Sequence, residues 1–177
     1  MDDDRKWIRL YGYDYRASGP YFVTICTRNA GHLLGAIQDG IVRVSAIGAM
    51  VQAEWLDLPS MHGGIRLDAH VVMPNHFHGI LVLPGIRRDG LDDLLLPGEA
   101  GPSLASVTGR FKSRTSRRAR RCHALPLRSL WQRGYFEHII RDERAFLAIR
   151  QYIADNAKTW ANDVLNPEHP RHWMFRR

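Results

Sequence analysis

The stretch IRLDAHVVMPNHFHGILVL, residues 65–83, consists of two apolar runs on either side of the dipeptide Pro74-Asn75. Proline and asparagine favour turns, and runs rich in β-branched and aromatic residues favour strands. The stretch therefore predicts a β-hairpin with strands at 65–73 and 76–83. Because side chains alternate along a strand, His76 and His78 share one face of the second strand and Phe77 lies on the other.

The segments outside this hairpin predict two further strands and three helices. Aromatic and β-branched residues after a Gly-Pro breaker indicate a strand, and apolar residues spaced three and four apart indicate amphipathic helices. The expected strands are 21–27 and 135–141, and the expected helices are 44–58, 102–121 and a long helix from Asp142 to about residue 163. This order predicts an α+β fold in which packed helices cover a mostly antiparallel sheet, similar to the ferredoxin-like or split βαβ arrangement.

Length and composition are those of an ordinary globular domain. With 177 residues, 45% of them hydrophobic and 24% charged, the chain predicts one domain over 1–177. No apolar run approaches the roughly 20 residues of a membrane helix, and the acidic start differs from a signal peptide, so we expect a cytoplasmic protein without a membrane span. Cys26 and Cys122 are expected to be free thiols. The Gly- and Pro-rich segment 84–101 predicts a mobile loop.

Positive charge is concentrated in one segment. The net charge is +7, and residues 102–133 hold nine basic residues and no acid. Such a concentration is typical of a site for a polyanion, most often nucleic acid, although a solvated basic helix is the alternative. The expected phosphate contacts are Arg110, Lys112, Arg114, Arg117, Arg118 and Arg121. Phe111 or Trp131 could stack on bases, and core packing is at least as well supported for both.

Two pairs of residues could carry chemistry. His76 and His78 on one strand face could bind a divalent metal or form a hydrogen-bonded pair. Tyr152 and Asn156 lie four residues apart on the last helix and therefore on one of its faces. They are either a packed tyrosine with a neighbouring amide, or a phenol nucleophile beside a carboxamide that completes a metal site.

Several segments resemble, in order, the signatures of REP-associated tyrosine transposases, a group of single-tyrosine HUH endonucleases. These segments are YFVTICT (21–27), VVMPNHFHG (71–79), LWQRGYFEH (130–138), IRDE (140–143) and IRQYI (149–153). The resemblance implies an HUH-type fold, His76, His78 and Asn156 as metal ligands, and Tyr152 as the nucleophile. Relatives commonly have Asn-Pro where this chain has Asn156-Ala157, and loss of the proline predicts a longer helix.

The resemblance also implies an activity, a cofactor and a partner. The expected enzyme is a transposase or endonuclease that cleaves and rejoins single-stranded or hairpin DNA through a 5′-phosphotyrosine, with Mg²⁺ or Mn²⁺. Some relatives are dimers that exchange the tyrosine helix, so a homodimer is an open alternative. Two other functions stay open: a DNA-binding protein of the same fold without catalytic activity, and a metal-dependent hydrolase that does not use Tyr152.

Overall fold

The main sheet has four antiparallel strands. The computed structural model describes residues 13–28, 31–84, 101–123 and 129–169. Its strands β1 (Gly19–Cys26), β4 (Arg66–Val72), β5 (His76–Leu83) and β6 (Phe136–Ile139) are arranged in the order β4-β5-β1-β6. Because β1 and β4 each pair antiparallel with β5, they run parallel to each other with β5 between them. This is the split βαβ arrangement expected from the sequence, and the fold class is α+β.

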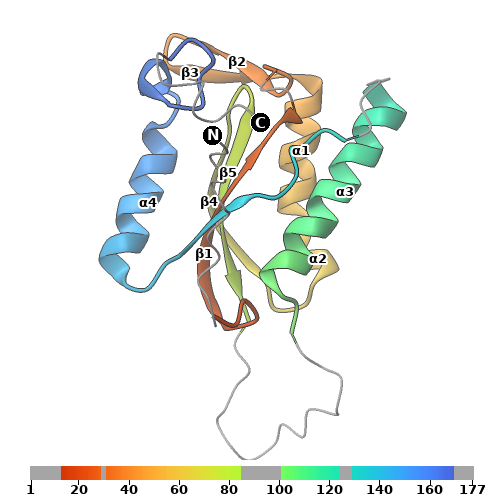
Figure 1. The fold of residues 1–177 in the computed structure, drawn as a ribbon, viewed down its shortest axis with the longest axis vertical. Helices are drawn as coiled ribbons and strands as arrows, with labels where there is room; N and C mark the ends of the chain where they lie inside the picture. Colours follow the sequence, from red (N-terminus) through yellow and green to blue (C-terminus); the bar gives the residue numbers. More distant parts are fainter. Residues whose placement is uncertain (1–12, 29–30, 85–100, 124–128, 170–177) are drawn as a thin grey trace, which may run out of the picture.

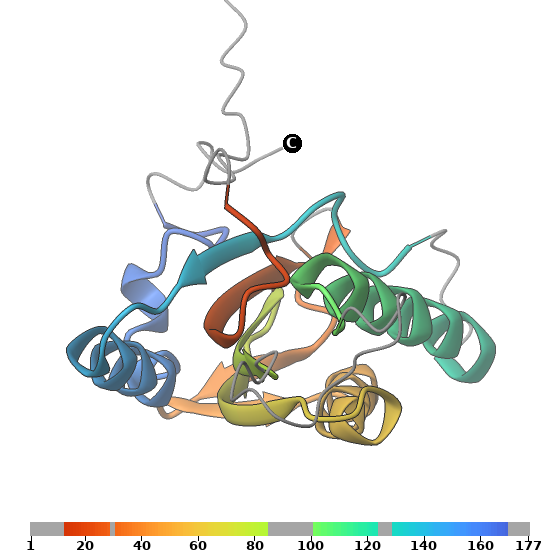
Figure 2. The ribbon, with the colours of Figure 1, turned by 90° about the horizontal axis from the view of Figure 1, so that it is seen from below.

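Helices cover both faces of this sheet (Figures 1 and 2). Helices α1 (Ala46–Leu56) and α3 (Leu104–His123) lie on one face, where the short helix α2 (Leu58–Met61) follows α1, and α4 (Glu143–Asp155) lies on the other face. Phe77 packs against Trp55 and Phe111 in the core on the α1 and α3 side. Ile80 and Ile153 belong to a smaller core beneath α4. The strand alternation predicted for residues 76–78 therefore separates Phe77 from the two histidines.

Helix α4 begins where the sequence predicts and ends earlier. Asp142 caps its start, with the carboxylate accepting from the Ala145 amide at 2.8 Å. The prediction of a helix to about residue 163, lengthened by Ala157, is wrong. The helix ends at Asp155, Asn156 is its C-cap, and the chain continues into the 3-10 helix η2 (Trp160–Asn162). Hydrogen bonds that span three residues replace helical ones there, including Asp163 N to Trp160 O at 3.0 Å.

A second, two-stranded sheet is absent from the sequence prediction. It is a hairpin of β2 (Gly35–Gln38) and β3 (Ile41–Val44), inserted between β1 and α1. Its turn residues Asp39 and Gly40 have φ of 52° and 70°, the left-handed values that an Asp-Gly turn accommodates. The turn signal was therefore present, and the strands of four residues were too short to show a period.

The expected mobile loop at 84–101 lies almost entirely outside the residues that the structure describes. Residues 85–100 of the expected mobile loop 84–101 are outside the described residues, as are residues 170–177 at the carboxyl end. Within the described part of the chain, no helix has both the length and the apolar character needed to cross a membrane.

Candidate active site

His76 and His78 lie side by side on the α4 face of β5. Both are buried, with exposed fractions of 0% and 2%, and their ring centroids are 4.5 Å apart. Thr24 of β1 is opposite His78, and its hydroxyl lies 2.8 Å from His78 Nδ1. Burial lowers the pKa of His78 to about 3, and burial together with the neighbouring His78 lowers that of His76 well below its usual value. Both rings are therefore neutral and each offers one nitrogen lone pair.

Asn75 fixes which nitrogen of His76 carries the hydrogen. Its amide nitrogen donates to the backbone carbonyl of Leu165 at 2.7 Å, so its Oδ1 is the atom that faces His76 Nδ1, 2.9 Å away. An oxygen acceptor there requires Nδ1 to be protonated, which leaves the lone pair on Nε2. Nε2 is buried and has no hydrogen-bond partner within the described residues.

Tyr152 brings a phenol hydroxyl to the histidine pair. Its oxygen lies 3.3 Å from His78 Nε2, and the two ring centroids are 5.3 Å apart. Burial of the hydroxyl and the charge of Asp163 raise the pKa of Tyr152, and the opposing effect of Asn156 is smaller. The side chain as a whole is nevertheless 45% exposed, so a ligand in solution has access to it.

Two further side chains bring oxygen atoms to the histidines. Asn156 is 1% exposed, and its Oδ1 is buried without a hydrogen-bond partner in the described part of the chain. Asp163, which follows η2, places Oδ2 3.7 Å from His76 Nε2. Ligand-type atoms of His76, His78 and Asp163 all lie within 4.8 Å of one another.

These nitrogen and oxygen atoms fit a divalent cation. His76 Nε2 and Asp163 Oδ2 are both hydrogen-bond acceptors. Burying two acceptors that face each other, with no hydrogen-bond donor, is costly unless a positive charge lies between them. Imidazole nitrogens with carboxamide or carboxylate oxygens suit Mn²⁺ and related ions. Nδ1 of His76 contacts Asn75 and Nδ1 of His78 contacts Thr24, and metal-binding histidines typically have such a hydrogen-bond partner on the ring nitrogen that does not face the ion.

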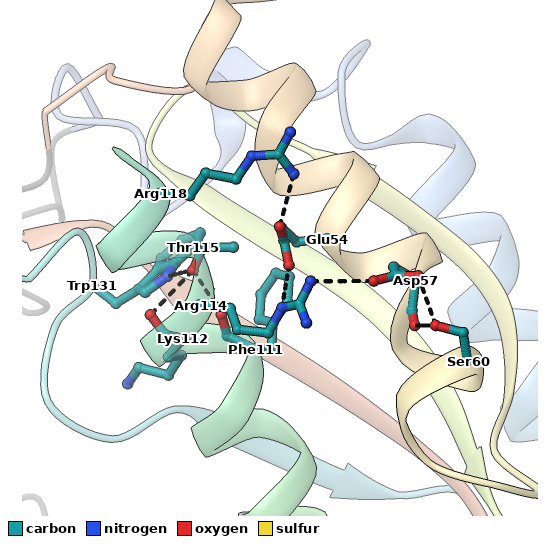
Figure 3. Close-up of polar contacts among 9 residues, drawn as sticks. All are labelled: Glu54, Asp57, Ser60, Phe111, Lys112, Arg114, Thr115, Arg118 and Trp131. Carbon is teal, nitrogen blue, oxygen red and sulfur yellow. Dashed lines mark hydrogen bonds and ion pairs between the residues drawn. The ribbon is translucent and has the colours of Figure 1, made fainter. Parts of the chain in front are cut away.

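Three of the six basic residues expected to contact DNA have partners inside the protein. Arg114 Nε lies 2.6 Å and Arg118 Nη1 2.8 Å from the carboxylate of the buried Glu54 on α1 (Figure 3). Lys112 donates to the backbone carbonyls of Gln132 and Gly134, and burial lowers its pKa to about 8. These contacts join α3 to its neighbours.

The other three, Arg110, Arg117 and Arg121, are exposed on α3. Helix α3 lies across the sheet from α4 and Tyr152, so the structure does not bring these arginines to the histidine pair (Figure 2). Phe111 and Trp131 are core residues with exposed fractions of 0% and 2%. The core alternative holds for both, and neither is available for base stacking.

Comparison with known proteins places the chain in a family. No protein-family model matches it. An uncharacterized protein of Haemophilus influenzae (strain Rd) is 35% identical over 168 residues, which are 91% of this chain and 92% of that protein. The chain belongs to the family of this Haemophilus protein.

Two solved structures align with most of this family member. The REP-associated tyrosine transposase, solved bound to a REP hairpin, aligns with 90% of this chain and 74% of its own at a TM-score of 0.57 and 23% identity. A crystal structure of a candidate transposase from Deinococcus radiodurans R1 aligns with 85% of this chain and 96% of its own, at a TM-score of 0.43 and 19% identity. The first alignment shows that the chain has the fold expected from the sequence resemblance.

Two residues near the histidines, Asn75 and Asp163, were not expected from the sequence of this family member. Asn75 was interpreted only as a turn former, yet its position next to His76 was a usable signal. Asp163 lies beyond α4 in a segment that was expected to be the end of a continuous helix. No spacing rule connects it to the histidines, because the 3-10 turns that bring it back to β5 have no periodic pattern.

Proposed function

We propose that the protein is a metal-dependent DNA transesterase that cleaves and rejoins single-stranded or hairpin DNA with Tyr152 as its nucleophile. The observation that carries this proposal is the 3.3 Å separation between the Tyr152 hydroxyl and His78 Nε2. A tyrosine that served only packing would not need an accessible ring beside a buried pair of neutral histidines. A phenol nucleophile needs both access to substrate and a group that positions its hydroxyl.

The reaction is an exchange of one phosphodiester bond for another. Tyr152 Oη attacks the scissile phosphorus, forms a bond to it, and displaces the 3′ oxygen of the preceding nucleotide. The phenol proton is transferred to that oxygen, giving a free 3′-hydroxyl and a 5′-phosphotyrosine. Because the bond energy is retained, a second 3′-hydroxyl can attack the phosphotyrosine and join the strands, with no nucleotide cofactor.

The residues that would hold the metal are His76, His78 and Asn156. A bound Mg²⁺ or Mn²⁺ would supply positive charge at the phosphate oxygens and offset the burial that disfavours a Tyr152 phenolate. Asn75 and Thr24 keep the imidazoles oriented for this role, and α4 keeps Tyr152 at the site. A carboxamide oxygen is a ligand type that suits Mg²⁺ and Mn²⁺, and these three residues include no thiolate, the ligand type that softer ions prefer.

DNA as the substrate is supported by the fold and the charge. The REP-associated tyrosine transposase with the same fold was solved with a REP hairpin. Arg110, Arg117 and Arg121 form one exposed basic row on α3, because their spacings of seven and four residues place them on one helix face. We propose these three as phosphate contacts, on a part of the DNA distinct from the strand at Tyr152.

A covalent-adduct assay tests the proposal. Labelled single-stranded oligonucleotides from the DNA flanking the gene are mixed with wild type or Tyr152→Phe, in Mn²⁺ or in chelator, and resolved on a denaturing gel. We expect an adduct only for wild type in metal. DNA binding without any adduct would support the binding protein without catalysis, and cleavage that persists in Tyr152→Phe would support the metal-dependent hydrolase.

A further inference from the structure

The carboxylate of Asp163 has no role in the reaction as written above, although it is the charged side chain beside the histidines. Its side chain is 7% exposed, and its Oδ2 points to His76 Nε2 at 3.7 Å. Oδ2 has no hydrogen-bond partner within the described residues. A buried carboxylate oxygen without a hydrogen-bond donor requires an explanation, because removing a charged group from water costs on the order of several kcal/mol.

We propose that Asp163 is a metal ligand, and that it supplies the charged donor of the site formed with His76, His78 and Asn156. This inference rests on the metal dependence of the proposed function. Two histidines and an asparagine bring no charge to a divalent cation, whereas a carboxylate neutralises part of it. Charge count is a main determinant of affinity for hard cations such as Mn²⁺ and Mg²⁺.

The distance between the two acceptors agrees with shared coordination. Ligand atoms about 2.1 Å from one ion are separated from each other by roughly 3 to 4 Å, depending on the angle at the ion. The 3.7 Å between His76 Nε2 and Asp163 Oδ2 lies in this range. It is too long for a hydrogen bond, so a proton shared between the two groups does not account for it.

The chain after α4 is built to present this carboxylate. The Leu165 amide donates to Asp163 Oδ1 at 2.7 Å, which fixes the carboxylate with Oδ2 turned to His76. Asn166 ties the segment together by donating to Trp160 O at 3.2 Å and accepting from the Glu168 amide at 3.1 Å.

Asn75 connects this segment to the histidine strand. Its amide nitrogen binds Leu165 O, and its amide oxygen binds His76 Nδ1. One side chain therefore orients the His76 ring and anchors the segment that carries Asp163. A hydrogen-bond partner that orients the ring is typical of a histidine that ligates a metal.

Calorimetric titration of Mn²⁺ into chelator-stripped protein tests the proposal. The variants are Asp163→Asn, which keeps the size and removes the charge, and Asp155→Asn as a matched control whose carboxylate pairs with Lys158 on the surface. We expect Asp163→Asn to weaken Mn²⁺ binding by at least about 10-fold, and Asp155→Asn to leave it unchanged. Equal affinity of wild type and Asp163→Asn would overturn the proposal, as would a wild type that binds no Mn²⁺.

Thermal unfolding in chelator separates a ligand from a structural ion pair. An asparagine at position 163 can donate to His76 Nε2, so we expect the metal-free variant to melt at the same temperature as wild type or higher. A lower melting temperature in chelator would indicate that Asp163 pairs with a protonated His76, and would overturn the proposal. Adduct formation is scored separately: a wild type that binds Mn²⁺ through Asp163 and forms no adduct contradicts the proposed function alone.

Discussion

Asn75 shows how one uncharged side chain can determine what an active-site histidine is able to do. Because its amide nitrogen is committed to the Leu165 carbonyl, its oxygen can only accept from His76. The lone pair of His76 is thereby directed away from the protein backbone and toward Asp163 and His78. Without this hydrogen bond, part of the His76 population would carry its proton on Nε2, and the lone pair would then lie on Nδ1, away from the site.

Replacing Asn75 by alanine should therefore weaken metal binding without removing a ligand. We expect Asn75→Ala to lower Mn²⁺ affinity by about 10- to 100-fold, the range known for loss of an outer-shell partner of a histidine ligand. Calorimetric titration measures the change. Asn162→Ala, an exposed residue of η2, is the control, and an unchanged affinity in Asn75→Ala would contradict the orienting role.

The arginines of helix α3 are of two kinds, those paired with an acidic residue and those without such a partner. Arg114 and Arg118 turn toward α1 and share the buried carboxylate of Glu54. Arg110, Arg117 and Arg121 are exposed and pair with no acidic residue in the described part of the chain, so their charges are available for a partner. The basic segment seen in the sequence therefore contributes both to packing between helices and to the proposed DNA surface.

The Glu54 cluster predicts a pH-dependent contribution to stability. Burial acts to raise the pKa of Glu54, but hydrogen bonds from Arg114 and Arg118 outweigh it, so the pKa is lowered in the folded protein. Its stabilisation is present above the unfolded pKa of about 4.3 and is lost as pH falls through the folded value. We expect Glu54→Gln to reduce the free energy of unfolding by about 1–3 kcal/mol at pH 7.

Denaturant unfolding of wild type and Glu54→Gln between pH 7 and pH 3 measures this contribution. The difference between the two proteins should shrink toward acidic pH as Glu54 of wild type becomes protonated. A difference that stays constant, or grows on acidification, would show that the ion pairs are not its source.

The exposed arginines predict a specific salt dependence of DNA binding. Substituting Arg110, Arg117 and Arg121 together by glutamine removes three charges, and should make the slope of log K against log salt shallower by about 2 for single-stranded DNA. Fluorescence anisotropy at several salt concentrations provides the slope. The double variant Arg114→Gln/Arg118→Gln is the control, because it also removes arginines from α3 and should leave the slope unchanged while reducing stability.

At the scale of the whole molecule, the order of elements was predictable and the local departures from it were not. Alternation within residues 76–78 places Phe77 in one core and the histidines against α4. A shift of the strand by one residue would move each of these side chains to the opposite face of the sheet, so the register is strongly specified. The short β2–β3 hairpin and the early end of α4 depend on turns and on hydrogen bonds spanning three residues, which leave little trace in a hydrophobic pattern.

The candidate site was predictable only where its residues lie on regular elements. Tyr152 and Asn156 share a helix face and the histidines a strand face, so spacing relates the members of each pair. Asp163 reaches the site through irregular backbone. The partnership of Glu54 with Arg114 and Arg118 joins two helices that are distant in sequence, and a charge count cannot distinguish a paired arginine from a free one.

The whole molecule thus places the proposed chemistry on one face of the sheet and an exposed basic row on the other. Substitutions that remove the chemistry at Tyr152 should leave DNA binding by the basic row intact, and substitutions in the basic row should leave metal binding intact. We expect Tyr152→Phe to bind hairpin DNA with the salt dependence of wild type, and the triple arginine variant to bind Mn²⁺ with wild-type affinity. If Tyr152→Phe lost the salt-dependent binding, the two faces would not be independent.

Mapping the attachment site of DNA on the protein tests the central claim most directly. After incubation of wild type with single-stranded DNA and Mn²⁺, nuclease and trypsin digestion should leave a nucleotide on the peptide of residues 151–158, which contains Tyr152 as its one tyrosine. The account predicts a 5′-phosphate ester on Tyr152, detected by tandem mass spectrometry, and a free 3′-hydroxyl on the released strand. A nucleotide attached to a different residue, or cleaved DNA with no attached nucleotide, would contradict it.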